Sequence, residues 1–197
     1  MHVTELDNSA YPECIAGTPS ESGEARSVGT LHLSTIYRDM EQQALLRRKP
    51  EMDERELAWY GAGGYLWEHA FAMAHRAAVI HGDLVRPGEW ELDGIVGSPD
   101  GIDILNWRVV ETKFRWMSSD KFDQLEKYFW LELVQVRGYC KMIHSQESLL
   151  WVFFCNGNYR PPRPVVRGKL LQFSEQEIEE SWAMIRAHAK RRGWLRP

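Results

Sequence analysis

Asp100, Glu111 and Lys113 are the residues of this chain whose types and spacing best suit metal-dependent chemistry. Ser98-Pro99-Asp100-Gly101 predicts a bend, and two apolar runs flank a second turn at Asn106-Trp107. The segment therefore predicts a β-hairpin with Asp100 on its first arm. Because alternate residues of a strand share a face, Glu111 and Lys113 point the same way and Asp100 can lie beside Glu111. Two carboxylates with an ammonium group suit a hard divalent cation and an activated water.

Two other aspartates compete with Asp100 for this role. Asp93 also precedes a glycine, and Asp103 lies three residues beyond Asp100. The Ser-Pro-Asp-Gly bend favours Asp100, because it places the carboxylate at the end of a strand rather than on its flat face.

Two further segments add polar side chains at regular spacing. A glycine-rich entry ending at Gly64 leads into an apolar helical pattern, with Glu68 on the flank of the apolar stripe. Downstream, Gln135 and Tyr139 lie four residues apart in a helical segment and therefore share one helix face.

Taken in order, four short motifs resemble those of the PD-(D/E)xK nuclease superfamily, and more narrowly its RecB-like and phage lambda-exonuclease-like branch. They are Gly-x-x-x-Glu at 64–68, Pro-Asp at 99–100, Glu-x-Lys at 111–113 and Gln-x-x-x-Tyr at 135–139. The resemblance implies an α/β fold of mixed α+β type. Its restriction-endonuclease-like core would hold a central mixed β-sheet of about four to five strands flanked by helices. It also implies a Mg²⁺- or Mn²⁺-dependent deoxyribonuclease that hydrolyses phosphodiester bonds.

Carried over position by position, the resemblance implies metal ligands at Glu68, Asp100, Glu111 and the backbone carbonyl of Thr112. Lys113 would orient or help deprotonate the attacking water and would balance the charge of the phosphate. Positioning the water electrostatically is the simpler role, because an ammonium beside carboxylates keeps its proton.

The same resemblance implies supporting roles around this set. Gln135 would hold the active-site strand or DNA, and Tyr139 would pack or bond beside it. Apart from the resemblance, Arg115-Trp116 directly follows Lys113 and lies close enough to contact a phosphate or stack on a base. His69 is an alternative ligand, since some RecB-like nucleases place a histidine near this helix, and Asp93 stays an alternative to Asp100.

The branch of the family implies an exonuclease or DNA-end-processing enzyme in recombination, repair or phage DNA metabolism. A structure-dependent or site-specific endonuclease, a catalytically inactive nuclease-like DNA-binding protein and an RNA-directed nuclease stay open. DNA is the expected partner, together with further copies of the chain or a recombination or replication protein. The expected location is the cytoplasm of a bacterium or of a phage-infected host.

Composition predicts one folded domain with an acidic tail. The net charge of −4 resides in residues 1–30, which hold five acids and one base, so residues 31–197 are balanced. We therefore expect a flexible tail over 1–30 and a single nuclease domain over 31–197. The tail lacks the blocks of a signal peptide, and no apolar run is long enough to span a membrane. Three scattered cysteines indicate a reducing compartment and no iron–sulfur cluster.

Apolar periodicity predicts the elements that position these residues. The first expected helix is capped by Ser34 and ends near Lys49-Pro50. Further helices are expected over 54–59, 65–80 and 120–143, with a last helix opened by a capping box at Ser174 and Glu177. The expected strands cover 89–97, 101–105, 108–114, 149–154 and 165–173. The final helix ends in a basic, aromatic segment that either contacts DNA phosphates or complements the helix dipole: Arg186, Lys190, Arg191, Arg192, Trp194 and Arg196.

Overall fold

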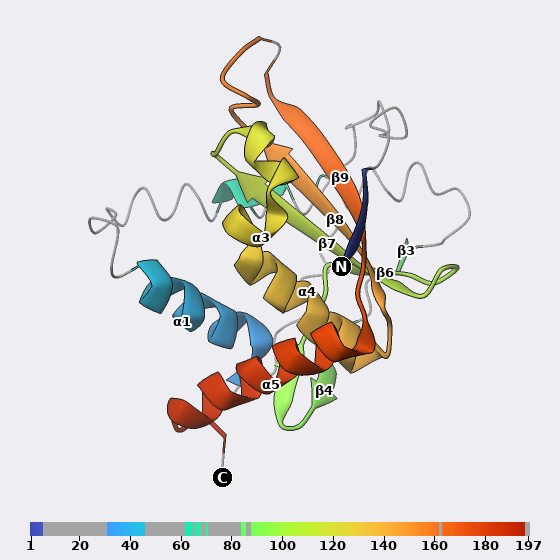
Figure 1. Cartoon of the computed structure of the whole chain (residues 1–197), viewed down its shortest axis with the longest axis vertical. Helices are drawn as coiled ribbons and strands as arrows, with labels where there is room; N and C mark the ends of the chain where they lie inside the picture. Colours follow the sequence, from blue (N-terminus) through green and yellow to red (C-terminus); the bar gives the residue numbers. More distant parts are fainter. Residues whose placement is uncertain are drawn as a thin grey trace.

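The computed structural model shows a mixed β-sheet with a layer of helices over one face (Figure 1). Helix α4 lies on strands β7 and β8, and α1 and α5 contact α4 and each other. The residues that the structure describes are 1–5, 31–45, 62–64, 66–67, 70, 84–85, 88–161 and 163–195.

The central sheet has six strands in the order β1-β9-β8-β7-β6-β3. Strands β7 and β8 pair in parallel, and the other neighbours in this sheet are antiparallel. The expected mixed sheet flanked by helices is confirmed, with two short edge strands added to a four-stranded centre. From edge to edge the strands are β1 (His2–Glu5), β9 (Val165–Gln172), β8 (Glu147–Phe154), β7 (Arg108–Arg115), β6 (Gly101–Asp103) and β3 (Leu84–Val85).

A second, three-stranded sheet replaces the single strand expected over 89–97. There β4 (Trp90–Leu92) and β5 (Ile95–Gly97) form a hairpin, and β2 (Leu31–His32) pairs with β5 in parallel. Asp93 and Gly94 turn the hairpin with φ angles of 53° and 75°. Asp-Gly is a strong signal for this type of two-residue turn, so the break was visible in the sequence.

The helix expected over 120–143 is divided into three pieces. They are η2 (Ser119–Asp123), a 3-10 helix, followed by α3 (Leu125–Tyr128) and α4 (Trp130–Ile143). The residues at the two breaks, Gln124 and Phe129, have φ angles of −117° and −126°. Phe122 and Phe129, on either side of α3, both reach the core, where their ring centroids lie 5.6 and 6.2 Å from that of Phe154.

The remaining helices follow the sequence more closely. Helix α1 (Leu33–Leu45) begins directly after β2, so Ser34 lies inside the helix rather than capping it. Helix α5 (Glu175–Arg191) begins at the expected capping box. The helix expected over 54–59 lies outside the described residues, and of the one over 65–80 only residues 66, 67 and 70 are described, as helical. No described helix has the length and apolar character needed to cross a membrane.

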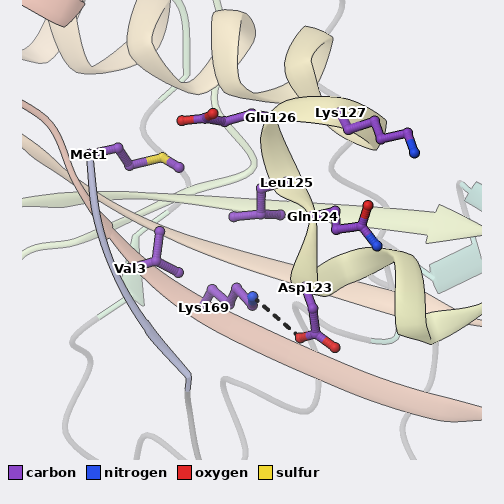
Figure 2. A pocket seen from close by; sticks show the side chains of 8 residues that line it. All are labelled: Met1, Val3, Asp123, Gln124, Leu125, Glu126, Lys127 and Lys169. Atoms are coloured by element: carbon purple, nitrogen blue, oxygen red, sulfur yellow. Dashed lines mark ion pairs between the residues drawn. The ribbon is translucent and has the colours of Figure 1, made fainter.

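The first five residues differ from the expected flexible tail. Residues 2–5 form β1, which pairs with β9 from His2 opposite Gln172 to Glu5 opposite Lys169. A cavity of about 390 Å³ lies between β1, β9 and the η2–α3 segment, where Lys169 pairs with Asp123 (Figure 2). Residues 6–30 lie outside the described part of the chain.

The two faces of the central sheet bury different side chains. Val109, Leu150, Val152 and Phe154 belong to the main core together with residues of α4. On the opposite face Val110 and Trp151 pack with Trp67, flanked by aromatic rings. Since side chains alternate along β7, Glu111 and Lys113 share the face of Val109 and lie on the side of α4.

The capping box of α5 predicts a pH-dependent stability. Burial by itself raises the pKa of Glu177, but the Ser174 backbone amide, the Met1 ammonium and the Ser174 hydroxyl together lower it from 4.5 to about 2. A depressed carboxyl pKa stabilises the folded state above pH 4.5, and this stabilisation is lost as the pH falls toward 2. In urea unfolding, we expect the wild type to lose about 2 kcal/mol over this range relative to Glu177→Gln. Parallel pH profiles for the two proteins would contradict the prediction.

Candidate active site

The site is built on the β6–β7 hairpin that the sequence predicts. Backbone pairing of β6 with β7 ends at Gly101, opposite Val110. Beyond this pair, the Asp100 side chain accepts hydrogen bonds from β7 in place of a backbone carbonyl of β6. Its Oδ2 accepts from the Thr112 backbone N (2.7 Å) and from Thr112 Oγ1 (2.8 Å). The bend at Pro99 thus anchors Asp100 to the strand that carries Glu111 and Lys113.

The same contact orients the backbone of Thr112. In an extended strand the N–H and C=O groups of one residue point to the same edge. Because the Thr112 N–H points at Asp100, the Thr112 carbonyl faces the same edge of β7, away from β8. Two oxygen types, a carboxylate and a backbone carbonyl, therefore converge at the point where β6 ends. The second Asp100 oxygen, Oδ1, accepts no hydrogen bond from any described residue.

Glu111 and Lys113 form an ion pair on the α4 side of β7, as their alternate spacing predicts. The Glu111 side chain is only 1% exposed, whereas that of Lys113 is 17% exposed. Burial by itself lowers the pKa of Lys113, but Glu111, followed by Tyr37 and Asp100, raises it above its ordinary value. Lys113 is therefore a fixed positive charge next to two carboxylates.

Helix α4 covers this group with a polar pair. Gln135 Nε2 donates a hydrogen bond to the Tyr139 hydroxyl (3.1 Å), and both side chains are buried. This confirms the prediction that the two residues share a helix face. Burial, assisted by the Glu111 carboxylate, raises the pKa of Tyr139, which keeps the phenol neutral and able to donate. Gln135 Oε1 is buried and has no hydrogen-bond partner within the described structure.

Two residues of this site were not found from the sequence. Glu132 of α4 is buried and forms an ion pair with Arg115, so Arg115 is held inside the site rather than extended into solvent. Tyr37 of α1 places its ring centroid 5.9 Å from Lys113 Nζ. A lone acid within the apolar run 130–136 was a visible signal for Glu132. Nothing local marks Tyr37, because its position depends on how α1 packs.

The structure separates Asp100 from its two rivals. Asp103 accepts hydrogen bonds from Arg108 Nε (2.7 Å) and Asn106, and so shapes the β6–β7 turn. Asp93 lies in the β4–β5 turn and is bonded to helix α5 through Trp182 Nε1 (2.8 Å). The structure therefore holds Asp93 at α5, whereas Asp100 bonds to Thr112 of the Glu-x-Lys strand.

The oxygen donors fit a hard divalent cation. Asp100, Glu111 and the Thr112 carbonyl offer only oxygen, and Mg²⁺ favours a few carboxylates completed by water. The described residues contain no group of three or more His, Cys, Asp and Glu side chains that could hold a metal by themselves. The expected third carboxylate, Glu68, and the alternative His69 lie outside the described residues.

The basic end of α5 has mainly structural contacts. Arg186 pairs with Asp93 (3.3 Å) and Arg192 with Asp39 (3.2 Å), which ties α5 to the β4–β5 turn and to α1. For this segment, these contacts favour a role within the folded structure over contact with DNA phosphates. Arg196 lies outside the described residues.

Comparison with known proteins identifies the fold. No protein-family model matches this chain, and no curated protein matches it in sequence. The crystal structure of SSO0001 is similar over 85% of this chain and 77% of that one, at 15% identity with a TM-score of 0.50. The chain therefore shares its fold with SSO0001. In this fold the Pro-Asp bend, the Glu-x-Lys strand and the Gln-x-x-x-Tyr helix lie together.

Other structural neighbours are similar over comparable lengths. A phage-related exonuclease from Haemophilus somnus 129PT is 14% identical, covers 90% of this chain and 89% of its own, and has a TM-score of 0.49. The alkaline exonuclease LHK-Exo from Laribacter hongkongensis is 14% identical, covers 84% and 94%, and has a TM-score of 0.44.

Proposed function

We propose that this protein is a metal-dependent deoxyribonuclease that hydrolyses phosphodiester bonds. The observation that carries the proposal is the pair of hydrogen bonds from Thr112 to Asp100. They anchor the Asp100 carboxylate to β7, where Thr112 lies between Glu111 and Lys113. A hairpin with no chemical role has no need to bury Glu111 and to keep it paired with Lys113.

Each residue of the site has a distinct role in this proposal. Asp100, Glu111 and the Thr112 carbonyl hold Mg²⁺ or Mn²⁺, with Glu68 as the expected further ligand. When bound, the cation neutralises phosphate charge and lowers the pKa of a bound water. Lys113 orients the attacking water and offsets the negative charge of the phosphate.

The surrounding side chains keep this group in place. Gln135 and Tyr139 pack over it from α4, and Arg115 is fixed by Glu132 beside it. These contacts restrict the rotamers of the charged groups, which is what preorganised electrostatic stabilisation requires.

The motif resemblance to the lambda-exonuclease-like branch supports an exonuclease or DNA-end-processing enzyme of recombination, repair or phage DNA metabolism, acting in the cytoplasm. DNA is the proposed substrate, and a ring of copies or a recombination protein is the proposed partner. An endonuclease that recognises a structure or a sequence is the second candidate, because the same hydrolytic group serves both reactions.

The test is digestion of end-labelled linear and closed-circular DNA, single- and double-stranded, with Mg²⁺, Mn²⁺ or EDTA. We expect cleavage of linear DNA only, with either metal and not with EDTA. Cleavage of closed circles would replace the exonuclease by the endonuclease. No cleavage with any metal would refute the proposed activity, and matched RNA substrates would reveal an RNA-directed enzyme.

Asp100→Asn provides the matched variant for this assay. Asparagine can still accept the two hydrogen bonds from Thr112, so only the charge at the metal site is lost. We expect the cleavage rate to fall by at least about a hundredfold. Asp103→Asn, which changes the β6–β7 turn, is the control and should retain cleavage within about threefold. Equal losses in both variants would contradict the assignment of Asp100.

A further inference from the structure

The loop between β8 and β9 is fixed next to the end of the Glu-x-Lys strand. Cys155 N donates to Arg115 O (3.0 Å), and Asn156 Nδ2 donates to Trp116 O (2.8 Å). Ser119 N donates to Gly157 O (2.8 Å), which joins the loop to the start of η2 as well. The loop extends from the top of the sheet in Figure 1. Its base is therefore held in place by the strand that carries Lys113.

The loop and the parts of β8 and β9 next to it carry basic residues and no acidic ones. From Ser148 to Ser174 the sequence holds four basic residues and no Asp or Glu. Two of the four, Arg167 and Lys169, pair with Asp123. The other two, Arg160 and Arg163, are exposed and form no ion pair with any described residue.

Two exposed aromatic rings accompany these arginines. Trp116 is 40% exposed and Tyr159 is 53% exposed. The Trp116 ring packs edge-on against the Phe114 ring, with 5.5 Å between the ring centroids, and this contact restricts its orientation. Tyr159 has a φ of 65°, an uncommon conformation for a residue other than glycine, and its carbonyl accepts a hydrogen bond from Arg163. Strained positions of this kind are found preferentially at functional sites.

The position of this patch relative to the catalytic group follows from the strand. Trp116 lies three residues beyond Lys113, which corresponds to about 10 Å along extended backbone. Because residues three apart along a strand point to opposite faces, the Trp116 ring lies with Phe114 on the face opposite Lys113, and a DNA strand bound at both passes around the end of β7.

We propose that the β8–β9 loop and Trp116 bind an unpaired segment of the DNA strand next to the site of cleavage. Arg160 and Arg163 contact its phosphates, and Trp116 and Tyr159 stack on its bases. Bases of a duplex are already stacked on both faces, whereas unpaired bases gain this contact with exposed aromatic rings. The inference rests on the proposed nuclease function and names the form of DNA that the site accepts.

Binding without cleavage tests the inference separately from the activity. Fluorescence anisotropy of a labelled oligothymidylate and of a blunt duplex of equal length is measured in EDTA, over a series of salt concentrations. The variants are Trp116→Ala/Tyr159→Ala and Arg160→Gln/Arg163→Gln. Lys190→Gln/Arg191→Gln, at the far end of α5 in Figure 1, is the control and removes the same charge. Thermal melting by circular dichroism confirms that each variant is folded.

For the aromatic variant, we expect the Kd for oligothymidylate to rise at least about fivefold and that for the duplex less than about twofold. The arginine variant should lower the slope of log K against log salt for oligothymidylate by about 1.4, at roughly 0.7 for each lost phosphate contact. The control should change neither quantity appreciably.

The opposite results are equally clear. If the aromatic variant lost the same affinity for oligothymidylate and for the duplex, the stacking contact would be overturned. If the control variant bound as weakly as the arginine variant, the placement of the phosphate contacts on the β8–β9 loop would be overturned. A wild type that does not bind oligothymidylate would also refute the inference. Binding as expected without cleavage under any metal would instead refute the proposed activity and leave the binding site intact.

Discussion

Lys113→Met is expected to lower the free energy of unfolding by about 3 kcal/mol, even without metal or DNA. The reason is the burial of its partner. The Glu111 side chain is 1% exposed, so removing the ammonium leaves a carboxylate inside the protein without its compensating charge. Methionine keeps most of the volume of lysine, which limits the contribution of lost packing. Urea unfolding in EDTA measures the effect.

The double variant Glu111→Gln/Lys113→Met should recover most of this loss, because both charges are then absent. Cleavage should be lost in the single and the double variant alike, so stability and activity separate. Arg108→Met is the control, since the carboxylate of its pair, Asp103, is 12% exposed against 1% for Glu111, and this pair should contribute about 1 kcal/mol or less. A double variant as unstable as the single one would show that the ion pair is not the cause.

Gly168→Ala is expected to destabilise the protein by about 1 to 3 kcal/mol. Gly168 lies opposite Trp151 in the β8–β9 pairing, and a Cβ at this position would meet Cε3 and Cζ3 of the Trp151 ring at 2.5 Å. The ring is buried against Val110 and Trp67, so it cannot move without disturbing that cluster. The chemical denaturation midpoint and the tryptophan emission maximum should both shift.

Gly64→Ala is the matched control for this experiment. A Cβ at Gly64 meets no atom of the described residues within 4 Å, and Gly64 is helical, so alanine should leave stability unchanged or raise it by up to about 1 kcal/mol. If both alanines have the same effect, the loss at Gly168 has another cause than the Trp151 contact.

The parts of the site that the sequence predicted are those set by local geometry. The side chains of Glu111 and Lys113 share a face because of the period of a strand, and Gln135 contacts Tyr139 because of the period of a helix. The bend at Asp100 follows from its Pro and Gly neighbours. Each of these needs only a few consecutive residues.

The parts that were missed depend on packing between distant segments. Tyr37 reaches Lys113 only because α1 lies beside α4, and no periodicity encodes that neighbour. The helix expected over 120–143 is interrupted because Phe122 and Phe129 both reach Phe154, a preference that outweighs helical continuity. The metal ligand expected at Glu68 stays a prediction.

The pairing of β1 with β9 has a consequence for how the chain folds. It joins residue 2 to residue 172, across almost the whole sequence. Closing so long a loop is entropically unfavourable until the rest of the sheet exists, so β1 should dock late, after the β8–β9 hairpin has formed. Until then the outer edge of β9 presents unpaired backbone groups to other molecules. The interval before β1 docks is therefore when a refolding chain is most exposed to aggregation.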